Sequence, residues 1–138
     1  LAASDAVFSI PAVRMGLGYR YSALKNLVDL VGVGAAKDLF YTARRVDAAE
    51  AFRMGLVTRT APVDQLPALL AEYTGSIGSN APLTLMAGKA IMSEILKPSP
   101  DLDDALCREL ILRCFESEDY VEGRRAFMDK RKPRFSGK

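Results

Sequence analysis

The stretch FESEDYVEGRRAFMDKRKPRF, residues 115–135, combines a helix signature with a concentration of charge. Asp119, with Glu122 three residues later, predicts a helix that begins in a capping box. Phe127 and Lys130 follow, three residues apart, a spacing that places both side chains on one face of a helix. An aromatic ring beside basic groups can be a solvated surface, a nucleic-acid arm or a clamp for a phosphorylated small molecule.

The charge around this stretch changes sign along the chain. Residues 101–119 carry seven acidic and two basic side chains, whereas residues 120–138 carry seven basic and two acidic ones. Adjacent blocks of opposite sign can pair with each other or with a neighbouring subunit. The acidic block, and the lack of an aromatic run in the basic one, argue against nucleic acid as a partner.

The composition excludes several classes of chemistry. The chain of 138 residues has no histidine, so a Ser-His-Asp triad, a Cys-His dyad and the common zinc sites each lack a necessary residue. We therefore expect no metal site. No apolar run approaches the ~20 residues of a membrane-spanning helix, so we expect no membrane partner.

The two cysteines indicate a compartment. Cys107 and Cys114 lie on one predicted helix, where their spacing separates them by about 10 Å along the axis. A disulfide needs Cα atoms within ~7 Å of each other. We expect two free thiols and a cytoplasmic location, because the cytoplasm is reducing.

A composition change near residue 63 divides the chain into two parts. Residues 1–63 mix extended segments with short helices, one of them bounded by an Asp47–Glu50 capping box and by Gly55. Residues 64–138 are helical throughout, with more apolar surface than a small body can cover, which predicts subunit contacts. The first predicted helix covers residues 21–31 and ends at Gly32. Further helices are predicted over residues 35–42, 48–54, 64–79 and 82–97, from a cap at Asp101 to residue 116, and from a cap at Asp119 to Pro133.

Four segments in this order resemble the C-terminal half of the crotonase (enoyl-CoA hydratase/isomerase) family. They are FSIPAVRMGL (8–17), VDAAEAFRMGLV (46–57), NAPLTLMAGKA (80–90) and the stretch quoted first. The resemblance implies an α/β crotonase-like fold, a ββα spiral followed by trimerisation helices, of which this chain is the mostly helical end. Residues 1–63 are then the end of the spiral core, and residues 64–138 a helical oligomerisation segment of a homotrimer or hexamer. It also implies that the oxyanion-hole segment lies upstream of Leu1, in a longer protein.

The resemblance implies an acyl-CoA thioester as the ligand, with coenzyme A as part of the substrate and no separate cofactor. In proteins that this chain resembles, the final helix contributes a Phe and a Lys to the nucleotide of the coenzyme. The matching positions here are Phe127 and Lys130. A flat ring can pack on adenine, and an ammonium group can bind phosphate oxygens.

One position departs from the family pattern. Hydratases that this chain resembles use two glutamates, one of which follows the proline of the first segment, where this chain has Ala12. A methyl group transfers no proton, so acid–base chemistry at this position is impossible. The catalytic residues are therefore unknown, and Tyr19 and Tyr21 are candidates to line the acyl pocket.

Together these features predict an acyl-CoA-binding enzyme of the crotonase fold. The first hypothesis is an enoyl-CoA hydratase, a lyase that adds water to a 2-enoyl-CoA in metabolism of the fatty-acid type. The alternatives are a CoA-ester isomerase or decarboxylase of the same fold, or a helical oligomerisation fragment without catalysis.

Overall fold

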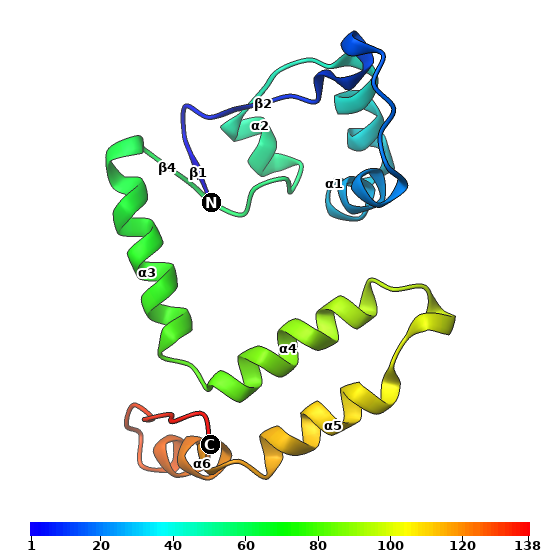
Figure 1. The fold of residues 1–138 in the computed structure, drawn as a ribbon. Coiled ribbons are helices and arrows are strands. Elements are labelled where there is room, and N and C mark those ends of the chain that lie inside the picture. Colours follow the sequence, from blue (N-terminus) through cyan, green and yellow to red (C-terminus); the bar gives the residue numbers. More distant parts are fainter. The chain divides into compact units, whose positions relative to one another are not determined.

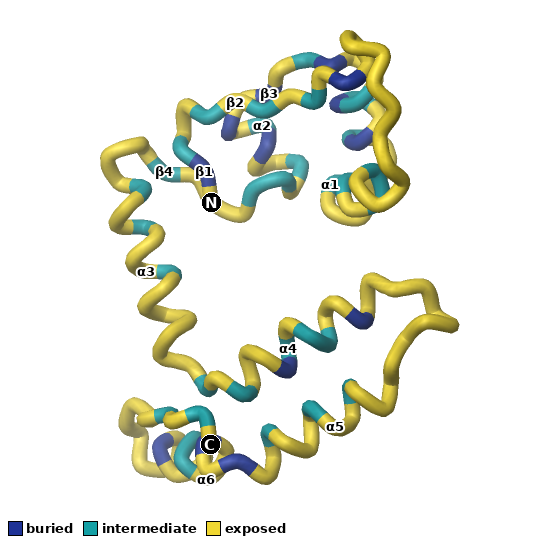
Figure 2. The backbone as a smooth tube through the Cα atoms, in the orientation of Figure 1, coloured by how far each residue is buried: buried dark blue, intermediate teal, exposed yellow.

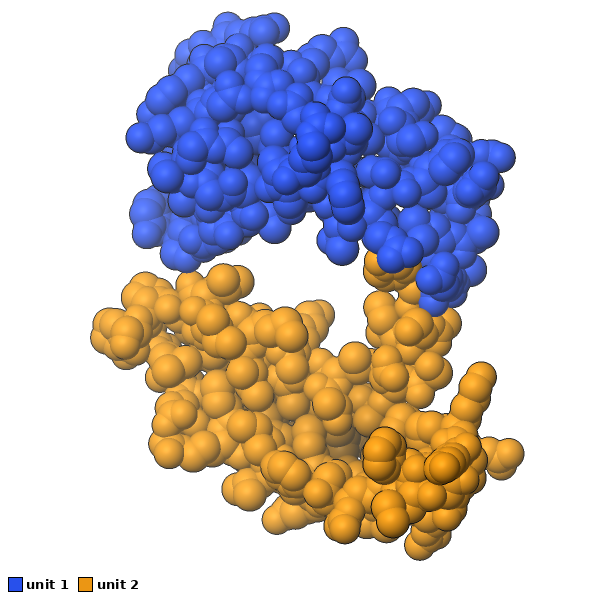
Figure 3. Space-filling model, turned by 180° about the vertical axis from the view of Figure 1, so that it is seen from behind, with its two compact units in different colours: residues 1–72 blue, residues 73–138 orange.

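A computed structural model describes residues 1–138, which form two compact units, Leu1–Glu72 and Tyr73–Lys138 (Figure 3). The division falls within helix α3 and not at the composition change near residue 63. In chain order the elements are β1 (Ala2–Ala3), β2 (Val7–Phe8), the 3₁₀ helix η1 (Pro11–Met15), α1 (Tyr21–Thr42), β3 (Val46–Asp47), α2 (Ala48–Arg53), β4 (Thr60–Ala61), η2 (Val63–Gln65), α3 (Leu66–Gly78), α4 (Pro82–Ile95), η3 (Ser99–Asp101), α5 (Asp104–Phe115) and α6 (Glu118–Met128) (Figure 1).

The strands of the first unit form two minimal sheets. β1 pairs with β4 in parallel, and β2 pairs with β3 in antiparallel orientation. The buried apolar side chains of this unit gather on α1, β3 and α2, where Leu39 and Val46 are the largest that are fully buried (Figure 2). This small core holds the β2–η1 segment against α1 and α2.

Helix α1 is interrupted where the sequence predicts a stop. Gly32 has φ 78° and ψ 158°, a backbone conformation that glycine alone adopts without strain, and it divides α1 into two helical arms (Figure 1). The predicted end of the first helix at Gly32 is confirmed.

The start of α2 is confirmed in one half and wrong in the other. The Asp47 carboxylate accepts the backbone N–H of Glu50 at 2.7 Å, so Asp47 is the N-cap. The Glu50 carboxylate does not return to Asp47 as a capping box requires; it binds the Arg44 guanidinium at 2.8 and 2.5 Å. A guanidinium offers two charge-assisted donors, which bind a carboxylate more strongly than one backbone N–H does. Gly55, with φ 81°, follows α2 in the left-handed conformation.

Two helix starts in the second unit lie two residues away from the predicted ones. Helix α5 is capped by Asp103, whose carboxylate accepts the N–H of Leu106 at 2.9 Å, while Asp101 lies in η3. Helix α6 is capped by Ser117, whose hydroxyl oxygen accepts the N–H of Tyr120 at 3.0 Å. In both places a polar side chain two residues from the predicted one accepts the bond from the free N–H group.

The connection between α4 and α5 is held by a buried carboxylate. Glu94 is 6% exposed and accepts two bonds from Lys97 Nζ, at 2.6 and 2.8 Å, and one from the N–H of Asp103 at 3.1 Å. The Lys97 ammonium, and then the Asp103 N–H, lower the pKa of Glu94 below its ordinary value. None of the helices combines the length and the apolar character that crossing a membrane requires.

Candidate functional site

Helix α6 ends in a Schellman motif built on a lysine. The N–H of Lys130 donates to the Phe127 carbonyl at 3.2 Å, and the N–H of Arg131 donates to the Ala126 carbonyl at 3.0 Å. Lys130 is left-handed, with φ 52°, at a position that glycine usually occupies. The prediction that Phe127 and Lys130 share a helix face is therefore wrong: Phe127 lies on α6, whereas Lys130 lies beyond its end.

The ring of Phe127 is presented to solvent. It is 82% exposed and lines one side of a groove of about 490 Å³ in the second unit, called the apolar groove below. Phe115 and Tyr120, also in this groove, pack edge to face with their ring centroids 5.1 Å apart. The remaining lining residues are Ala81, Thr84, Cys114, Asp119, Gly123, Arg124 and Phe135. An exposed ring next to apolar walls suits a flat ligand.

Residues 131–138, the tail, fold back along α6 and are held by two carboxylates. Asp119 is 3% exposed and accepts the N–H groups of Ser136 at 2.6 Å and Gly137 at 2.9 Å. Its own N–H donates to the Lys138 carbonyl at 3.3 Å. The sequence predicts that Asp119 caps α6. This prediction is wrong, because Asp119 binds the end of the tail.

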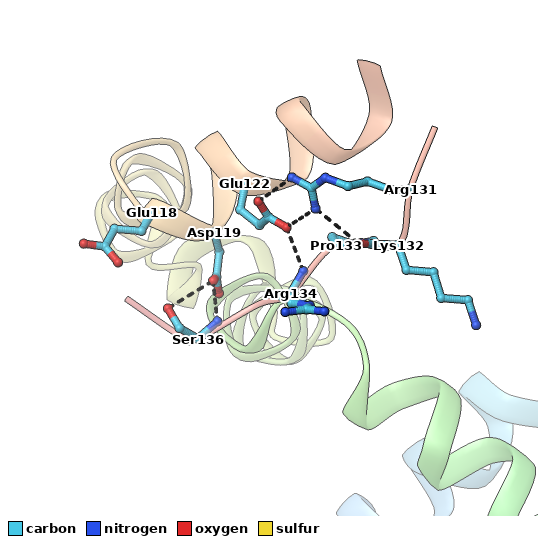
Figure 4. Close-up of a pocket in the computed structure, with 8 residues that line it drawn as sticks. All are labelled: Glu118, Asp119, Glu122, Arg131, Lys132, Pro133, Arg134 and Ser136. Carbon is cyan, nitrogen blue, oxygen red and sulfur yellow. Dashed lines mark hydrogen bonds and ion pairs between the residues drawn. The ribbon is translucent and has the colours of Figure 1, made fainter. Parts of the chain in front are cut away.

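Glu122 binds the beginning of the tail. Its carboxylate accepts a parallel pair of bonds from the Arg131 guanidinium, at 2.7 and 2.9 Å, and the backbone N–H of Arg134 at 2.8 Å (Figure 4). The guanidinium, and then the Arg134 N–H, lower the pKa of Glu122 to about 2. The prediction that Glu122 is a capping residue is wrong, because these three donors take up both of its oxygens.

The tail and α6 enclose a second groove, of about 850 Å³. Its lining residues are Glu118, Asp119, Glu122, Arg131, Lys132, Pro133, Arg134 and Ser136 (Figure 4). The guanidinium of Arg131 is neutralised by Glu122, whereas the side chains of Lys130, Lys132 and Arg134 have no carboxylate partner. These three side chains therefore leave positive charge available to an anion at this end of the chain.

The residues predicted around the acyl pocket lie in the first unit. Ala12 is 2% exposed within η1, and its carbonyl accepts the N–H of Leu17 at 3.0 Å. Tyr19 packs edge to face on Phe40, with ring centroids 5.4 Å apart, and Tyr21 is 81% exposed at the start of α1. A groove of about 360 Å³ in the same unit is lined by Val7, Phe8, Ser9, Ile10, Leu27, Leu39 and Leu56, and so by neither tyrosine candidate nor by Ala12. Their roles stay predictions.

The sequence reasoning missed the pair formed by Glu122 and Arg131. The two residues are too far apart in sequence for a helical side-chain pair, which needs a spacing of three or four. Only the reversal of the chain after Lys130 brings them together. In the sequence, Pro133, which cannot continue a helix, was the one indication of that reversal.

The comparisons with known proteins agree with this architecture. The sequence model of the enoyl-CoA hydratase/isomerase family matches residues 1–138. The chain belongs to that family. Crotonyl-CoA hydratase of Syntrophomonas wolfei is 35% identical over 138 residues, which are 100% of this chain and 53% of that protein. Methylmalonyl-CoA decarboxylase of Escherichia coli is 30% identical over 139 residues, covering 99% of this chain and 53% of that protein.

The fold is confirmed by solved structures. The crystal structure of enoyl-CoA hydratase from Bacillus anthracis superimposes with a TM-score of 0.88 at 30% identity, covering 99% of this chain and 53% of that one. The crotonase-like fold, mostly helical in this chain, is therefore correct. This member of the enoyl-CoA hydratase/isomerase family spans about half the length of the relatives it matches.

Proposed function

We propose that this chain is the C-terminal half of an acyl-CoA-binding enzyme, and that Phe127 and Lys130 bind the nucleotide end of coenzyme A. The observation that carries the proposal is the 82% exposure of the Phe127 ring beside an apolar groove. A ring that is mostly exposed contributes little to folding, whereas it can stack on adenine. Lys130, strained and without a carboxylate partner, is available to a phosphate oxygen.

The proposed reaction is addition of water to a 2-enoyl-CoA, as in metabolism of the fatty-acid type. The names of two relatives, a crotonyl-CoA hydratase and a short-chain-enoyl-CoA hydratase, support it. Because Ala12 provides no acid or base, activation of water rests on the glutamate that the family resemblance implies upstream of Leu1. The substrate brings the coenzyme, so no separate cofactor is proposed.

A second candidate is a CoA-ester decarboxylase or isomerase of the same fold. Ala12 favours it, because these reactions need one base or none, and a methylmalonyl-CoA decarboxylase is among the relatives. An assay of the full-length protein against crotonyl-CoA, a 3-enoyl-CoA and a malonyl-type thioester separates the candidates. Turnover of crotonyl-CoA that rises in Ala12→Glu supports hydration with a missing carboxylate; turnover of another thioester alone excludes hydration.

The proposed assembly is a homotrimer or hexamer. Large apolar side chains of α4 and α5 are exposed, among them Met86, Met92, Ile95, Leu112 and Phe115. Such side chains are typical of surfaces that a subunit covers. The rival, an oligomerisation segment without catalysis, predicts an oligomer that does not bind coenzyme A.

The unpaired thiols of Cys107 and Cys114 support the cytoplasm as the compartment.

The binding proposal is tested with Phe127→Ala and Lys130→Ala in the full-length protein. Titration calorimetry with coenzyme A should show about tenfold weaker binding for each variant, from lost stacking and from a lost charge-assisted bond. Met128→Ala is the matched control, because Met128 is the next residue and is 79% exposed. The proposal fails if both variants bind coenzyme A as tightly as the unmodified protein does.

A further inference from the structure

We propose that Glu122 is a positioning residue for coenzyme binding, which acts by holding the chain on the far side of Lys130 so that the lysine points at its ligand. The inference rests on the proposed function, since it needs Lys130 to bind the coenzyme. The hydrogen bonds at the end of α6 support the inference.

Lys130 has a left-handed backbone conformation. A left-handed residue other than glycine is unfavourable and persists only when its surroundings impose it. The two Schellman bonds impose part of this conformation, but both are backbone bonds at the end of a helix, where helices tend to fray. A contact beyond Lys130 is needed to fix the direction in which the chain leaves the helix.

The ion pair between Arg131 and Glu122 fixes this direction. Arg131 follows Lys130 directly, and both of its terminal nitrogens bind the two oxygens of Glu122. A parallel pair of bonds between a guanidinium and a carboxylate fixes orientation as well as distance. The Arg134 N–H binds the same carboxylate, so Glu122 holds the chain on both sides of Pro133.

Two other carboxylates also contact the tail, one far from Lys130 and one only weakly. Asp119 binds Ser136 and Gly137, at the far end of the tail from Lys130. Asp129 contacts Arg131 Nε at 3.4 Å, a long and exposed ion pair. Glu122, whose side chain is 22% exposed, is the carboxylate with close bonds to the residue that follows Lys130.

The consequence concerns affinity rather than chemistry. Without Glu122, Lys130 keeps its charge but samples more conformations, and the coenzyme must order it on binding. Losing one pre-ordered side chain of this kind weakens binding by roughly three- to tenfold. Turnover of saturated enzyme should not change, because Glu122 does not touch the acyl group that reacts in the proposed function.

The test uses Glu122→Gln in the full-length protein, because glutamine keeps the shape and removes the charge. We expect coenzyme A to bind roughly three- to tenfold more weakly, with KM of the turned-over thioester raised and kcat unchanged. Glu118→Gln is the matched control: it removes the same charge from the same helix, and Figure 4 marks no hydrogen bond or ion pair between its side chain and the tail residues drawn. Arg131→Lys keeps the charge but loses the parallel pair of bonds, so its affinity for coenzyme A should lie between those of Glu122→Gln and Glu118→Gln.

A double variant separates positioning from a general loss of structure. If Glu122 acts through Lys130, Glu122→Gln added to Lys130→Ala should weaken binding no further. Equal affinity of Glu122→Gln and the unmodified protein, or fully additive losses in the double variant, would overturn the inference while leaving the proposed function intact. Unchanged affinity of Lys130→Ala and Phe127→Ala would instead remove the proposed function, and the inference with it.

Discussion

Lys130 has two separable properties: its left-handed backbone conformation affects stability, and its ammonium group affects the proposed binding of coenzyme A. We compare Lys130→Gly with Lys130→Ala. Both variants remove the ammonium group, but only glycine adopts φ 52° without steric cost. The two variants should therefore bind coenzyme A equally weakly, about tenfold below the unmodified protein, and differ in stability.

The size of the difference follows from the backbone. A left-handed residue with a Cβ atom costs roughly 1–2 kcal/mol. Glycine makes the unfolded chain more flexible, which offsets about 0.4–1 kcal/mol of that gain. Lys130→Gly should therefore be more stable than Lys130→Ala by roughly 0.5–1 kcal/mol. Lys130→Ala should be close to the unmodified protein, because exposed substitutions change stability within about 0.5 kcal/mol.

The measurement is urea unfolding at one fixed protein concentration, since assembly makes stability depend on concentration. Asp129 supplies a control with the opposite sign: it has φ −80° and ψ −3°, the right-handed conformation. There the glycine variant should be less stable than the alanine variant by about 0.5–1 kcal/mol. If Lys130→Gly is less stable than Lys130→Ala, residue 130 is not left-handed in solution and the reasoning fails.

Three further predictions concern the fold. Asp103→Ala should lower the free energy of unfolding by about 1 kcal/mol through loss of the α5 cap, and Asp101→Ala by much less, as urea midpoints will show. The pKa of Glu94 is lowered in the folded state, so its contribution to stability is present above the unfolded value of 4.5 and is lost as pH falls through the folded value. The stability gap to Glu94→Gln, measured by urea unfolding, should therefore narrow as pH falls below 4.5. Gly32→Ala should cost roughly 1–2 kcal/mol because φ is 78°, whereas Gly34→Ala should stabilise the chain by about 0.5–1 kcal/mol in thermal unfolding.

Features that depend on a few neighbouring residues were predicted correctly from the sequence. Gly32 interrupts α1, Asp47 caps α2 and Gly55 follows it in the left-handed conformation. Each of these depends on backbone sterics or on one bond within a single helical turn, so the local sequence contains the necessary information. The order of four family segments was likewise enough to predict the crotonase-like fold, which the solved relatives confirm.

The partners of the carboxylates were not predictable in this way. The sequence predicted that Glu50, Asp119 and Glu122 take part in helix caps. In the structure Glu50 binds Arg44, Asp119 binds the backbone of Ser136 and Gly137, and Glu122 binds Arg131. A carboxylate binds the strongest donor within reach, and a guanidinium or a pair of backbone N–H groups comes within reach only when distant parts of the chain fold together.

The two residues at the candidate site illustrate the same division. That an aromatic and a basic residue stand three apart near the end of the chain was evident from the sequence alone. That α6 ends before Lys130, which leaves the ring on the helix and the amine beyond it, was decided by the tertiary structure. The physical reason is that the helix continues or stops according to whether the tail can bind back onto α6, and this is a property of the folded chain.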